Sequence, residues 1–321
     1  MRSFAAILLL LGVGTMLSAA STDYYLGESV RQLGLRDAPR QASDGRGSER
    51  YVTRGGLSLY AEFGKESILV DGVKVMLEDP VGSQRGHLTL SKVDYEKVFV
   101  PLFWEAPTAG VRRIVIDPGH GGKDTGKING PYKYNEKAAT LDTAARLKLV
   151  LEKQGFEVFF TRTSDVFVDL DNRPAVAAAA KADLFISLHY NAGPAGDTAS
   201  SGIETYCLTP AGQKSTNAGK AKSTTTTAEA GNRFDQPNML LAWGIQRRLL
   251  AGTGSEDRGV RRARFAVLRP LSCPGVLIEG GFISSRKEGA QIADAAYRQK
   301  IAESVAAGIV DYVVRGRPAA K

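Results

Sequence analysis

Residues 114–122 read Ile-Val-Ile-Asp-Pro-Gly-His-Gly-Gly, an apolar run that ends in a glycine-rich loop carrying His120. Residues 184–191, Leu-Phe-Ile-Ser-Leu-His-Tyr-Asn, repeat the arrangement with His189 near their end. Short apolar runs bounded by turn residues predict buried parallel strands. The carboxyl ends of such strands form one edge of an open α/β sheet, so the two imidazoles can meet there. Imidazole is the commonest metal ligand, and the two loops therefore predict a metal site.

Strand-like and helical patterns alternate from residue 112 onward. Residues 136–154 form the clearest helix, with Asn135 as its N-cap and Gly155 as its stop. Its apolar residues are Leu141, Ala145 and Leu149 on one face, with Leu147 and Leu151 beside it. The other expected strands are 114–117, 156–161, 183–188, 203–208, 265–268 and 276–278, and the other expected helices are 173–181, 238–250 and 297–313. This alternation predicts an α/β fold, a mostly parallel twisted sheet with helices on both faces.

The region before residue 105 has a different pattern. Apolar and polar residues alternate over residues 57–61, and Asp71-Gly72 between two valines predicts a hairpin turn. We therefore expect a small β-rich accessory domain over residues 21–105, followed by a catalytic domain over residues 112–315. Residues 210–237 are polar and rich in threonine, and we expect a flexible insertion there, either disordered or a mobile flap.

The first twenty residues resemble a targeting segment rather than part of the fold. Arg2 precedes an apolar run over residues 4–11, and small residues at Ser18 and Ala20 fit cleavage after residue 20. We expect a signal peptide over residues 1–20 and an exported protein of the periplasm or cell envelope. An uncleaved N-terminal anchor is the alternative. The apolar run is too short for a membrane span, so none is expected in the mature form.

The formal net charge of +8 is unevenly distributed. Residues 21–105 hold 11 Lys and Arg against 13 Asp and Glu, whereas residues 106–321 hold 30 against 21. Five arginines cluster in the second part: Arg258, Arg261, Arg262, Arg264 and Arg269. A basic surface attracts polyanions, and in an exported protein an anionic envelope polymer is a better candidate than nucleic acid. A merely solvated basic face is the alternative.

The two cysteines do not form a disulfide scaffold. Cys207 and Cys273 are the only ones in 321 residues, and both flank apolar runs. Export would permit a disulfide between them, whereas their surroundings favour two buried thiols.

A catalytic zinc ion needs three protein ligands and one open position. Glu136 is the candidate third ligand, because it opens the helix after the glycine-rich loop, and a helix N-terminus favours an ionised carboxylate. Glu279 ends an apolar run just before two glycines, where a carboxylate is poorly explained by packing. It is the candidate general base for a metal-activated water, with a salt bridge to a nearby arginine as the alternative.

Two rival interpretations of the motifs are weaker. A phosphate-binding P-loop needs Gly-Lys followed by Ser or Thr, but Gly122-Lys123 is followed by Asp124. A serine hydrolase would carry a G-x-S-x-G elbow, and none occurs in the sequence.

Five motifs in order resemble the zinc-dependent N-acetylmuramoyl-L-alanine amidases of the amidase 3 family. They lie at residues 115–122, 135–136, 187–192, 202–206 and 279–284, and the resemblance spans about residues 112–313. It implies Zn²⁺ held by His120, Glu136 and His189, with Glu279 as the catalytic residue. It also implies that the chain hydrolyses the amide between the lactyl group of N-acetylmuramic acid and L-alanine. The expected partner is peptidoglycan, with an activator protein as a further candidate and no nucleic acid.

Other positions of the resemblance are less defined. Asn191 and Glu204 are candidate substrate-binding residues, whereas Arg162 and Arg173 match family positions whose role we expect to be structural. Ser285 stands where the family often has asparagine. Another zinc amide hydrolase or peptidase on the same scaffold, and a non-catalytic wall-binding protein, are the alternative functions. The accessory domain loosely resembles the small N-terminal domains that such enzymes carry.

Overall fold

The computed structural model describes residues 23–32, 36–37, 47–52, 57–103, 110–216 and 227–315. The predicted signal peptide lies outside these residues. The strands are β1 (Tyr24–Tyr25), β2 (Arg36–Asp37), β3 (Ser48–Val52), β4 (Ser58–Glu62), β5 (Ser67–Val70), β6 (Val73–Met76), β7 (Gly82–Gln84), β8 (His87–Leu90), β9 (Arg113–Pro118), β10 (Ile128–Asn129), β11 (Tyr134–Asn135), β12 (Glu157–Phe160), β13 (Leu184–Asn191), β14 (Ile203–Leu208), β15 (Asp257–Ala263) and β16 (Gly275–Phe282). The helices are α1 (Leu26–Gln32), α2 (Lys92–Asp94), η1 (Tyr95–Phe99), α3 (Val100–Phe103), α4 (Glu136–Lys153), α5 (Asn172–Ala179), η2 (Ala230–Phe234), α6 (Asp235–Thr253), α7 (Arg286–Ala293) and α8 (Ala295–Arg315).

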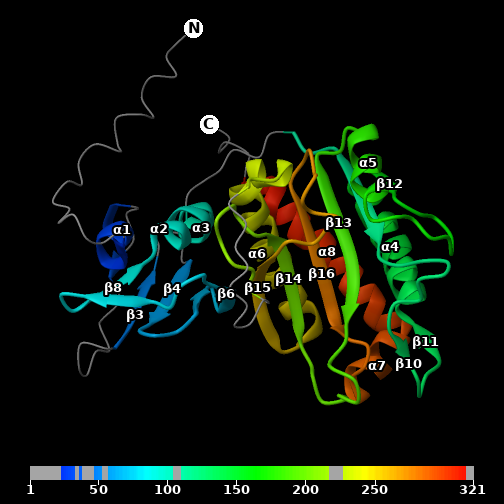
Figure 1. Cartoon of the computed structure of the whole chain (residues 1–321), viewed down its shortest axis with the longest axis horizontal. Helices are drawn as coiled ribbons and strands as arrows, with labels where there is room; N and C mark the ends of the chain where they lie inside the picture. Colours follow the sequence, from blue (N-terminus) through cyan, green and yellow to red (C-terminus); the bar gives the residue numbers. More distant parts are fainter. Residues whose placement is uncertain are drawn as a thin grey trace, which may run out of the picture.

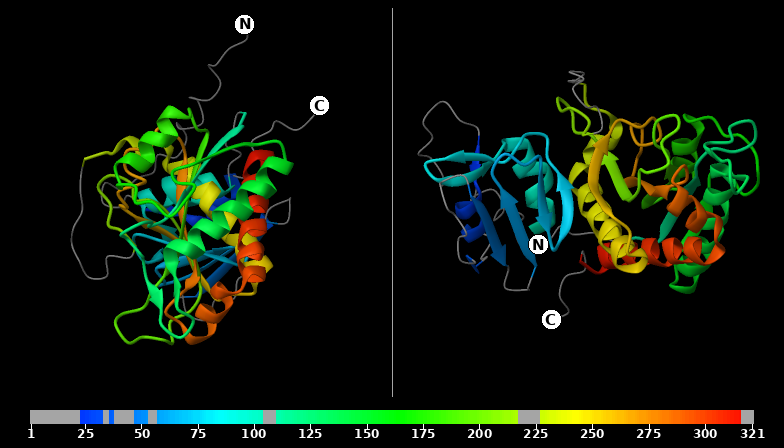
Figure 2. Two further views of the ribbon diagram at one scale, coloured as in Figure 1. Left: turned by 90° about the vertical axis from the view of Figure 1, so that its right-hand side faces the viewer. Right: turned by 90° about the horizontal axis from the view of Figure 1, so that it is seen from below.

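One sheet of eleven strands runs through the molecule in the order β12-β9-β13-β16-β14-β15-β6-β5-β4-β3-β2 (Figure 1). Strands β12, β9, β13 and β16 are parallel to one another, whereas β14 runs antiparallel to β16 and parallel to β15. Helices α4, α6 and α8 lie on one face of the catalytic part, and α5 lies on the other (Figures 1 and 2). The predicted α/β fold, mostly parallel with helices on both faces, is confirmed.

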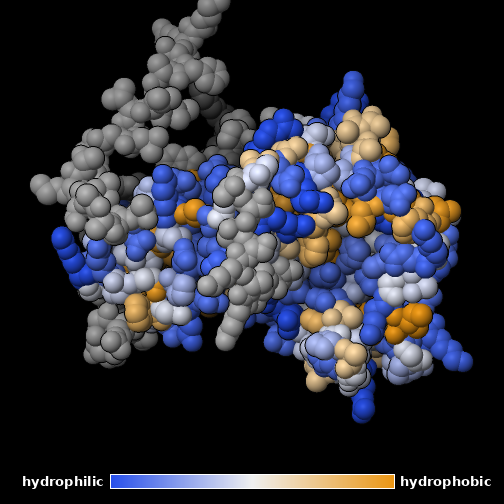
Figure 3. All heavy atoms as spheres, viewed as in Figure 1, coloured by the Kyte–Doolittle hydropathy of each residue, from blue (hydrophilic) through white to orange (hydrophobic). Residues whose placement is uncertain are grey.

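The core of the catalytic part lies between the sheet and the helices α4, α6 and α8, whose apolar side chains face the strands. Leu147 of α4, Ile186 of β13, Ile245 of α6 and Ile309 of α8 are all fully buried in one hydrophobic cluster. The opposite face, turned to the viewer in Figure 1, is hollowed over the strands and floored by hydrophilic side chains (Figure 3). A functional site on this face would therefore be open to solvent.

The predicted apolar face of α4 is wrong in part. Ala145 and Leu149 are exposed, Leu149 by 60%, whereas Leu147 and Leu151, predicted beside that face, are fully buried together with Ala139 and Ala144. Asn135 stands at the N-cap position, but its side chain makes no capping hydrogen bond.

A second error concerns the arginine-rich run. The sequence predicts a strand over residues 265–268, but the strand is β15 at Asp257–Ala263, and residues 266–270 form a turn. The pattern also indicates a basic surface, yet Arg262 is 1% exposed. The arginines alternate between the two faces of the sheet, because a strand turns successive side chains to opposite sides. Helix α7 is a further element that the sequence patterns do not predict.

The accessory region is joined to the catalytic region through the sheet itself. Val260 of β15 pairs in parallel register with Val75 of β6, and the predicted hairpin joins β5 to β6 with φ of 53° at Asp71 and 78° at Gly72. The Arg262 guanidinium donates to the Asp94 carboxylate at 3.0 Å, and both side chains are buried. The two regions thus share one sheet and one hydrophobic core. The domain boundary between residues 105 and 112 stays a prediction.

Parts of the predicted insertion at 210–237 are ordered. Thr216 donates its backbone N–H to the Arg262 carbonyl at 2.9 Å, and η2 and the start of α6 occupy residues 230–237. Residues 217–226 lie outside the described part, so flexibility there stays a prediction. Cys207 and Cys273 are free and buried, as the apolar surroundings favoured. Within the described ranges, no helix has the length and apolar character of a membrane span.

Candidate active site

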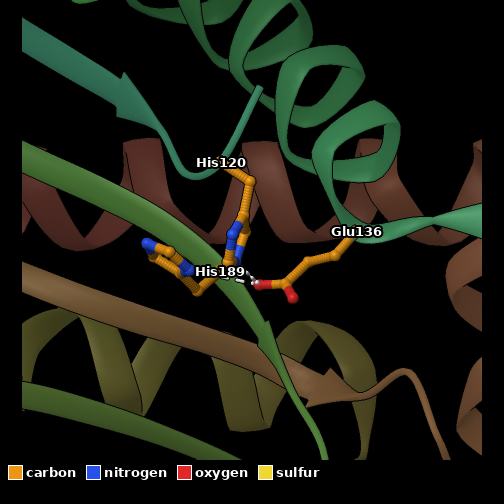
Figure 4. A group of neighbouring side chains, drawn as sticks. All are labelled: His120, Glu136 and His189. Atoms are coloured by element: carbon orange, nitrogen blue, oxygen red, sulfur yellow. Dashed lines mark hydrogen bonds and ion pairs between the residues drawn. The ribbon is translucent and has the colours of Figure 1, made fainter. Parts of the chain in front are cut away.

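The three predicted metal ligands lie together at one edge of the sheet (Figure 4). His120 follows β9, His189 lies near the end of β13, and Glu136 is the first residue of α4. Glu136 Oε1 lies 2.9 Å from His120 Nε2 and 3.1 Å from His189 Nδ1. One ligand atom from each residue falls within 4.8 Å of the others, so this cluster could hold a metal ion.

The donor set fits a zinc-sized ion. Around a tetrahedral ion with bonds of about 2.0–2.1 Å, neighbouring ligand atoms lie roughly 3.3 Å apart. The distances from Glu136 Oε1 to the two histidine nitrogens, 2.9 and 3.1 Å, would have to lengthen only slightly to reach that value. His120 Nδ1 lies 2.9 Å from Asp124 Oδ2, which orients the ring and leaves Nε2 for the metal. Two imidazoles, one carboxylate and a carboxylate behind one imidazole are the ligand chemistry of such sites.

Glycines make room for the three ligands. A Cβ atom at Gly126 would lie 2.6 Å from Glu136 Oε2 and 2.7 Å from His120 Cδ2. A Cβ atom at Gly119 would lie 2.2 Å from His189 Cε1. The backbone thus approaches the ligands more closely than any other residue type allows. Asp124 and Gly126 are functional positions that the sequence motifs did not single out, although an acid four residues after a ligand histidine was a usable signal.

The loop that carries His120 is held by two buried arginines. His120 itself has φ of 62°, an unfavourable value for a residue with a Cβ. Arg162 donates to the carbonyls of Pro118 at 2.9 Å and Gly119 at 2.8 Å, and Arg173 donates to the His120 carbonyl at 3.0 Å. These hydrogen bonds hold the loop in its strained conformation. Arg173 also pairs at 2.8 Å with the fully buried carboxylate of Asp117. Both arginines are therefore structural supports of the site.

The electrostatics of the cluster favour the ionised form of Glu136. Burial raises the pKa of Glu136, but hydrogen bonds from His120 and His189 and their charges outweigh it, and the pKa falls below its ordinary value. Burial lowers the pKa of His120, but its contacts with Glu136 and Asp124 raise it overall. Glu136 is consequently ionised at neutral pH, which coordination requires.

Glu279 lies beside the cluster, half-buried, with one carboxyl oxygen that has no hydrogen-bond partner among the described residues. It pairs in register with His189 on β13 and with Glu204 on β14, so the three side chains share one face of the sheet. Its Oε2 is buried and makes no hydrogen bond within the described residues. Burial raises its pKa well above the ordinary value, and the carboxylates of Glu136 and Glu204 raise it further. The alternative role for Glu279, a salt bridge to an arginine, is not seen among the described residues.

Glu204 and Asn191 are placed near Glu279 but face each other. Asn191 Nδ2 donates to Glu204 Oε1, which also accepts from the Tyr206 hydroxyl at 3.1 Å. The other oxygen of Glu204 lies 2.8 Å from Arg261 Nε and 3.3 Å from Arg258 Nε. Glu204 is 2% exposed and its carboxylate is fully bonded, so its direct use in substrate binding stays a prediction.

Comparisons with known proteins match the region that contains this site. A family model described as N-acetylmuramoyl-L-alanine amidase matches residues 114–311. The amidase AmiC of Escherichia coli O6:H1 is 33% identical over 229 residues, covering 65% of this chain and 54% of AmiC. The amidase LytC of Bacillus subtilis is 35% identical over 199 residues, covering 62% of this chain and 35% of LytC. The chain thus spans about half of one curated relative and about a third of the other.

Solved structures agree with the sequence comparison. The catalytic domain of the amidase CwlV from Bacillus (Paenibacillus) polymyxa var. colistinus has a TM-score of 0.53 and 31% identity, covering 64% of this chain and 99% of that chain. The amidase AmiC2 of Nostoc punctiforme has a TM-score of 0.53 and 30% identity, covering 64% and 98%. With a family match over more than half of its length and the ligand cluster inside that match, the chain belongs to the N-acetylmuramoyl-L-alanine amidase family, amidase 3.

Proposed function

We propose that this chain is a zinc hydrolase that cleaves the amide between N-acetylmuramic acid and L-alanine in peptidoglycan. The observation that carries the proposal is Glu279, a half-buried residue whose Oε2 is buried without a hydrogen-bond partner in the described structure, next in register to His189. A buried carboxyl oxygen without a partner costs stability, and such groups concentrate at functional sites. Family membership supports the choice of substrate.

His120, Glu136 and His189 would hold Zn²⁺, with Asp124 orienting the His120 ring. When bound, zinc supplies a Lewis acid that polarises the scissile carbonyl and lowers the pKa of water toward ~7. Three protein ligands would leave the ion one coordination position for water or substrate, as in catalytic zinc sites.

Glu279 would carry the proton through the reaction. It takes a proton from the attacking water as the carbon–oxygen bond forms, and then gives it to the nitrogen of L-alanine as the carbon–nitrogen bond breaks. The products are the lactyl carboxylic acid and a free amino terminus. The raised pKa of Glu279 supports this role, because a carboxyl that holds a proton readily can keep it between the two steps.

Location and partners belong to the same proposal. Residues 1–20 support export to the periplasm or cell envelope, where peptidoglycan lies. A protein activator is a candidate partner, because the CwlD amidase of Clostridioides difficile, 26% identical with a TM-score of 0.53, was solved in complex with the GerS lipoprotein.

The test is mass spectrometry of peptidoglycan digested by the purified protein, alone, with a chelator, and after zinc is restored. We expect zinc-dependent release of stem peptides that begin with a free L-alanine amino group, and glycan strands of unchanged length. Cleavage within the peptide would instead identify a zinc peptidase on the same scaffold. An intact wall despite bound zinc would refute autonomous activity, and digestion with envelope extract added would then test for an activator.

A further inference from the structure

Strand β16 leaves its regular pairing directly after Glu279. Strands β13 and β16 are in register at Glu279 and again at Phe282, but between these points β16 has two glycines against Tyr190 alone. The extra residue makes a β-bulge, in which Gly281 takes φ of 120°. On the other side of β16, the last pair with β14 is Glu279 with Glu204. Bulges beside functional sites re-aim a side chain or end the pairing of a strand. The backbone of Glu279 therefore lies where the regular sheet stops.

The carboxylate of Glu288 takes the place of the missing pairing. Glu288 belongs to α7, which follows β16 at the end of the sheet (Figure 1), and it is 4% exposed. Its Oε1 accepts from the backbone N–H of Gly202 at 2.8 Å, and its Oε2 accepts from the backbone N–H of Phe282 at 2.7 Å. Gly202 directly precedes β14 and Phe282 ends β16. One buried carboxylate thus joins the two strands just beyond their last pair, through hydrogen bonds of the strong, charge-assisted kind.

The start of α7 leaves this carboxylate free to reach the strands. Ser285 is the N-cap of α7, and its side chain accepts from the backbone N–H of Glu288. In a capping box the glutamate at this position accepts in return from the backbone N–H of the N-cap residue. Here the Ser285 N–H donates instead to the Phe282 carbonyl at 3.0 Å. The Glu288 carboxylate is therefore not used to cap its own helix.

The two glycines between Glu279 and Phe282 are enclosed by neighbouring side chains. The Tyr297 hydroxyl of α8 donates to the Gly280 carbonyl at 3.0 Å. A Cβ atom at Gly280 would lie 2.9 Å from Tyr190 Cε1, and one at Gly281 would lie 3.2 Å from Glu288 Oε2. Elements β13, α7 and α8 thus all contact this short segment. A shift of the Glu288 carboxylate would reach the backbone two residues from Glu279.

The position of the Glu279 carboxyl depends on this backbone. Its Oε2 has no hydrogen-bond partner among the described residues, so no side-chain contact of that oxygen fixes it. The charges of Glu136 and Glu204 act against the ionised carboxylate instead of holding it. A misplacement of about 1 Å, caused by a change away from the reacting atoms, can cost on the order of 100-fold in rate. A group that fixes the end of β16 would therefore affect the proton transfer proposed for Glu279.

We infer that Glu288 is the positioning residue of Glu279: by holding the ends of β14 and β16 together, it keeps the Glu279 carboxyl in place beside the metal ligands. The inference rests on the proposed function and adds to it the group that fixes its proton carrier. Glu288 acts through the backbone and is not assigned any contact with substrate or metal.

The test compares Glu288→Gln with a matched control. Glutamine offers one oxygen and one NH₂ group, so one of the two backbone N–H groups loses its acceptor. With zinc-loaded protein and an N-acetylmuramoyl peptide as substrate, kcat should fall about 10- to 100-fold, with KM and the Kd for zinc nearly unchanged. Glu288→Asp keeps both oxygens on a shorter side chain, so it should lose less, and it serves as the second variant if the glutamine variant does not fold.

Asp183→Asn is the control, because it disturbs the same kind of contact at the opposite edge of the sheet. Asp183 Oδ2 accepts from the backbone N–H groups of Arg112 and Arg113, both at 2.8 Å, where β9 and β13 begin. This variant should keep the wild-type kcat. An equal fall of kcat in both variants would show general destabilisation and would overturn the inference.

A second measurement needs no turnover: hydrogen exchange of the same proteins, followed by mass spectrometry. Glu288→Gln should speed exchange at residues 202–204 and 279–283 by about 10-fold or more and leave the start of β9 unchanged, whereas Asp183→Asn should do the reverse. Unchanged exchange in Glu288→Gln, or faster exchange with a wild-type kcat, would overturn the inference while the proposed function stands. A zinc-loaded wild-type protein that cleaves no muramoyl amide would instead refute the proposed function, and the exchange rates would still decide whether Glu288 holds the strand ends.

Discussion

Replacing Gly126 by alanine should weaken metal binding while leaving the fold intact. Gly126 has φ of 60°, and its nearest neighbours are the ligands themselves: a Cβ atom would lie 2.6 Å from Glu136 Oε2 and 2.7 Å from His120 Cδ2. Ordinary contacts of a Cβ atom begin near 3.4 Å. Two ligands would thus have to retreat by several tenths of an ångström, whereas a metal site tolerates about 0.2 Å.

The substitution at Gly126 has two separate effects: backbone strain, which lowers the folding free energy, and displacement of the ligands, which lowers the zinc affinity. An alanine at positive φ costs roughly 1–2 kcal/mol of folding free energy wherever it stands. Gly254 at the end of α6 has φ of 65° and no atom within 4 Å of its Cβ position, so Gly254→Ala isolates that strain. Gly126→Ala should carry the same strain and also lose zinc affinity by about 10- to 100-fold or more, the effect of disturbing the groups that orient ligands.

The assay is competition for zinc against a chromogenic chelator, with thermal unfolding of both variants in the presence of chelator. We expect similar Tm values for the two metal-free variants and a weakened Kd for zinc only in Gly126→Ala. Equal zinc affinity in both variants would show that the ligand cluster has more room than its geometry indicates, and would refute the reasoning.

Other consequences can be measured separately. Glu279→Gln should abolish turnover and keep zinc. Because it removes a carboxyl that Glu136 and Glu204 repel, it should not lower the free energy of unfolding. Turnover near the wild-type level would exclude Glu279 as the proton carrier. Asp94→Ala should lower the free energy of unfolding by about 3–5 kcal/mol, because Arg262 would stay buried without its partner. Asp71→Asn breaks an exposed ion pair and keeps a side chain that tolerates positive φ, so it should cost only about 0–1 kcal/mol. Equal denaturation midpoints for the two variants would contradict this difference. Burial raises the pKa of both cysteine thiols to about 12, so neither should react with a thiol reagent at a pH of about 8 until the protein unfolds, and fast labelling of the native protein would disprove it.

The chemistry of the site could be predicted from local sequence. His120 and His189 each follow an apolar run, and such runs end at one edge of an open α/β sheet whatever the rest of the chain does. Glu136 opens a helix that starts at the same edge. The position of Asp124 is equally local, because it lies four residues after His120, and an acid at that spacing is a signal that the sequence already contains.

The long arginine-rich run could not be interpreted in the same way. Arg261 and Arg262 are neighbours in the sequence and look alike as surface charges. In the structure Arg261 faces Glu204 on the site side, whereas Arg262 faces Asp94 and is buried. The partner of each arginine comes from a segment more than 50 residues away, and no local pattern contains that information.

The sequence by itself therefore determined most of the strands of the catalytic region, its main helices, the turn at Asp71-Gly72 and the candidate metal ligands, because these follow from periods, turns and residue chemistry that act over a few positions. Tertiary structure alone decided which face of α4 is buried, that β15 pairs with β6, and that the arginines of β15 divide between the buried carboxylates of Asp94 and Glu204. The physical reason is that burial and pairing of a charge depend on distant partners, whose positions are set only when the whole sheet has assembled.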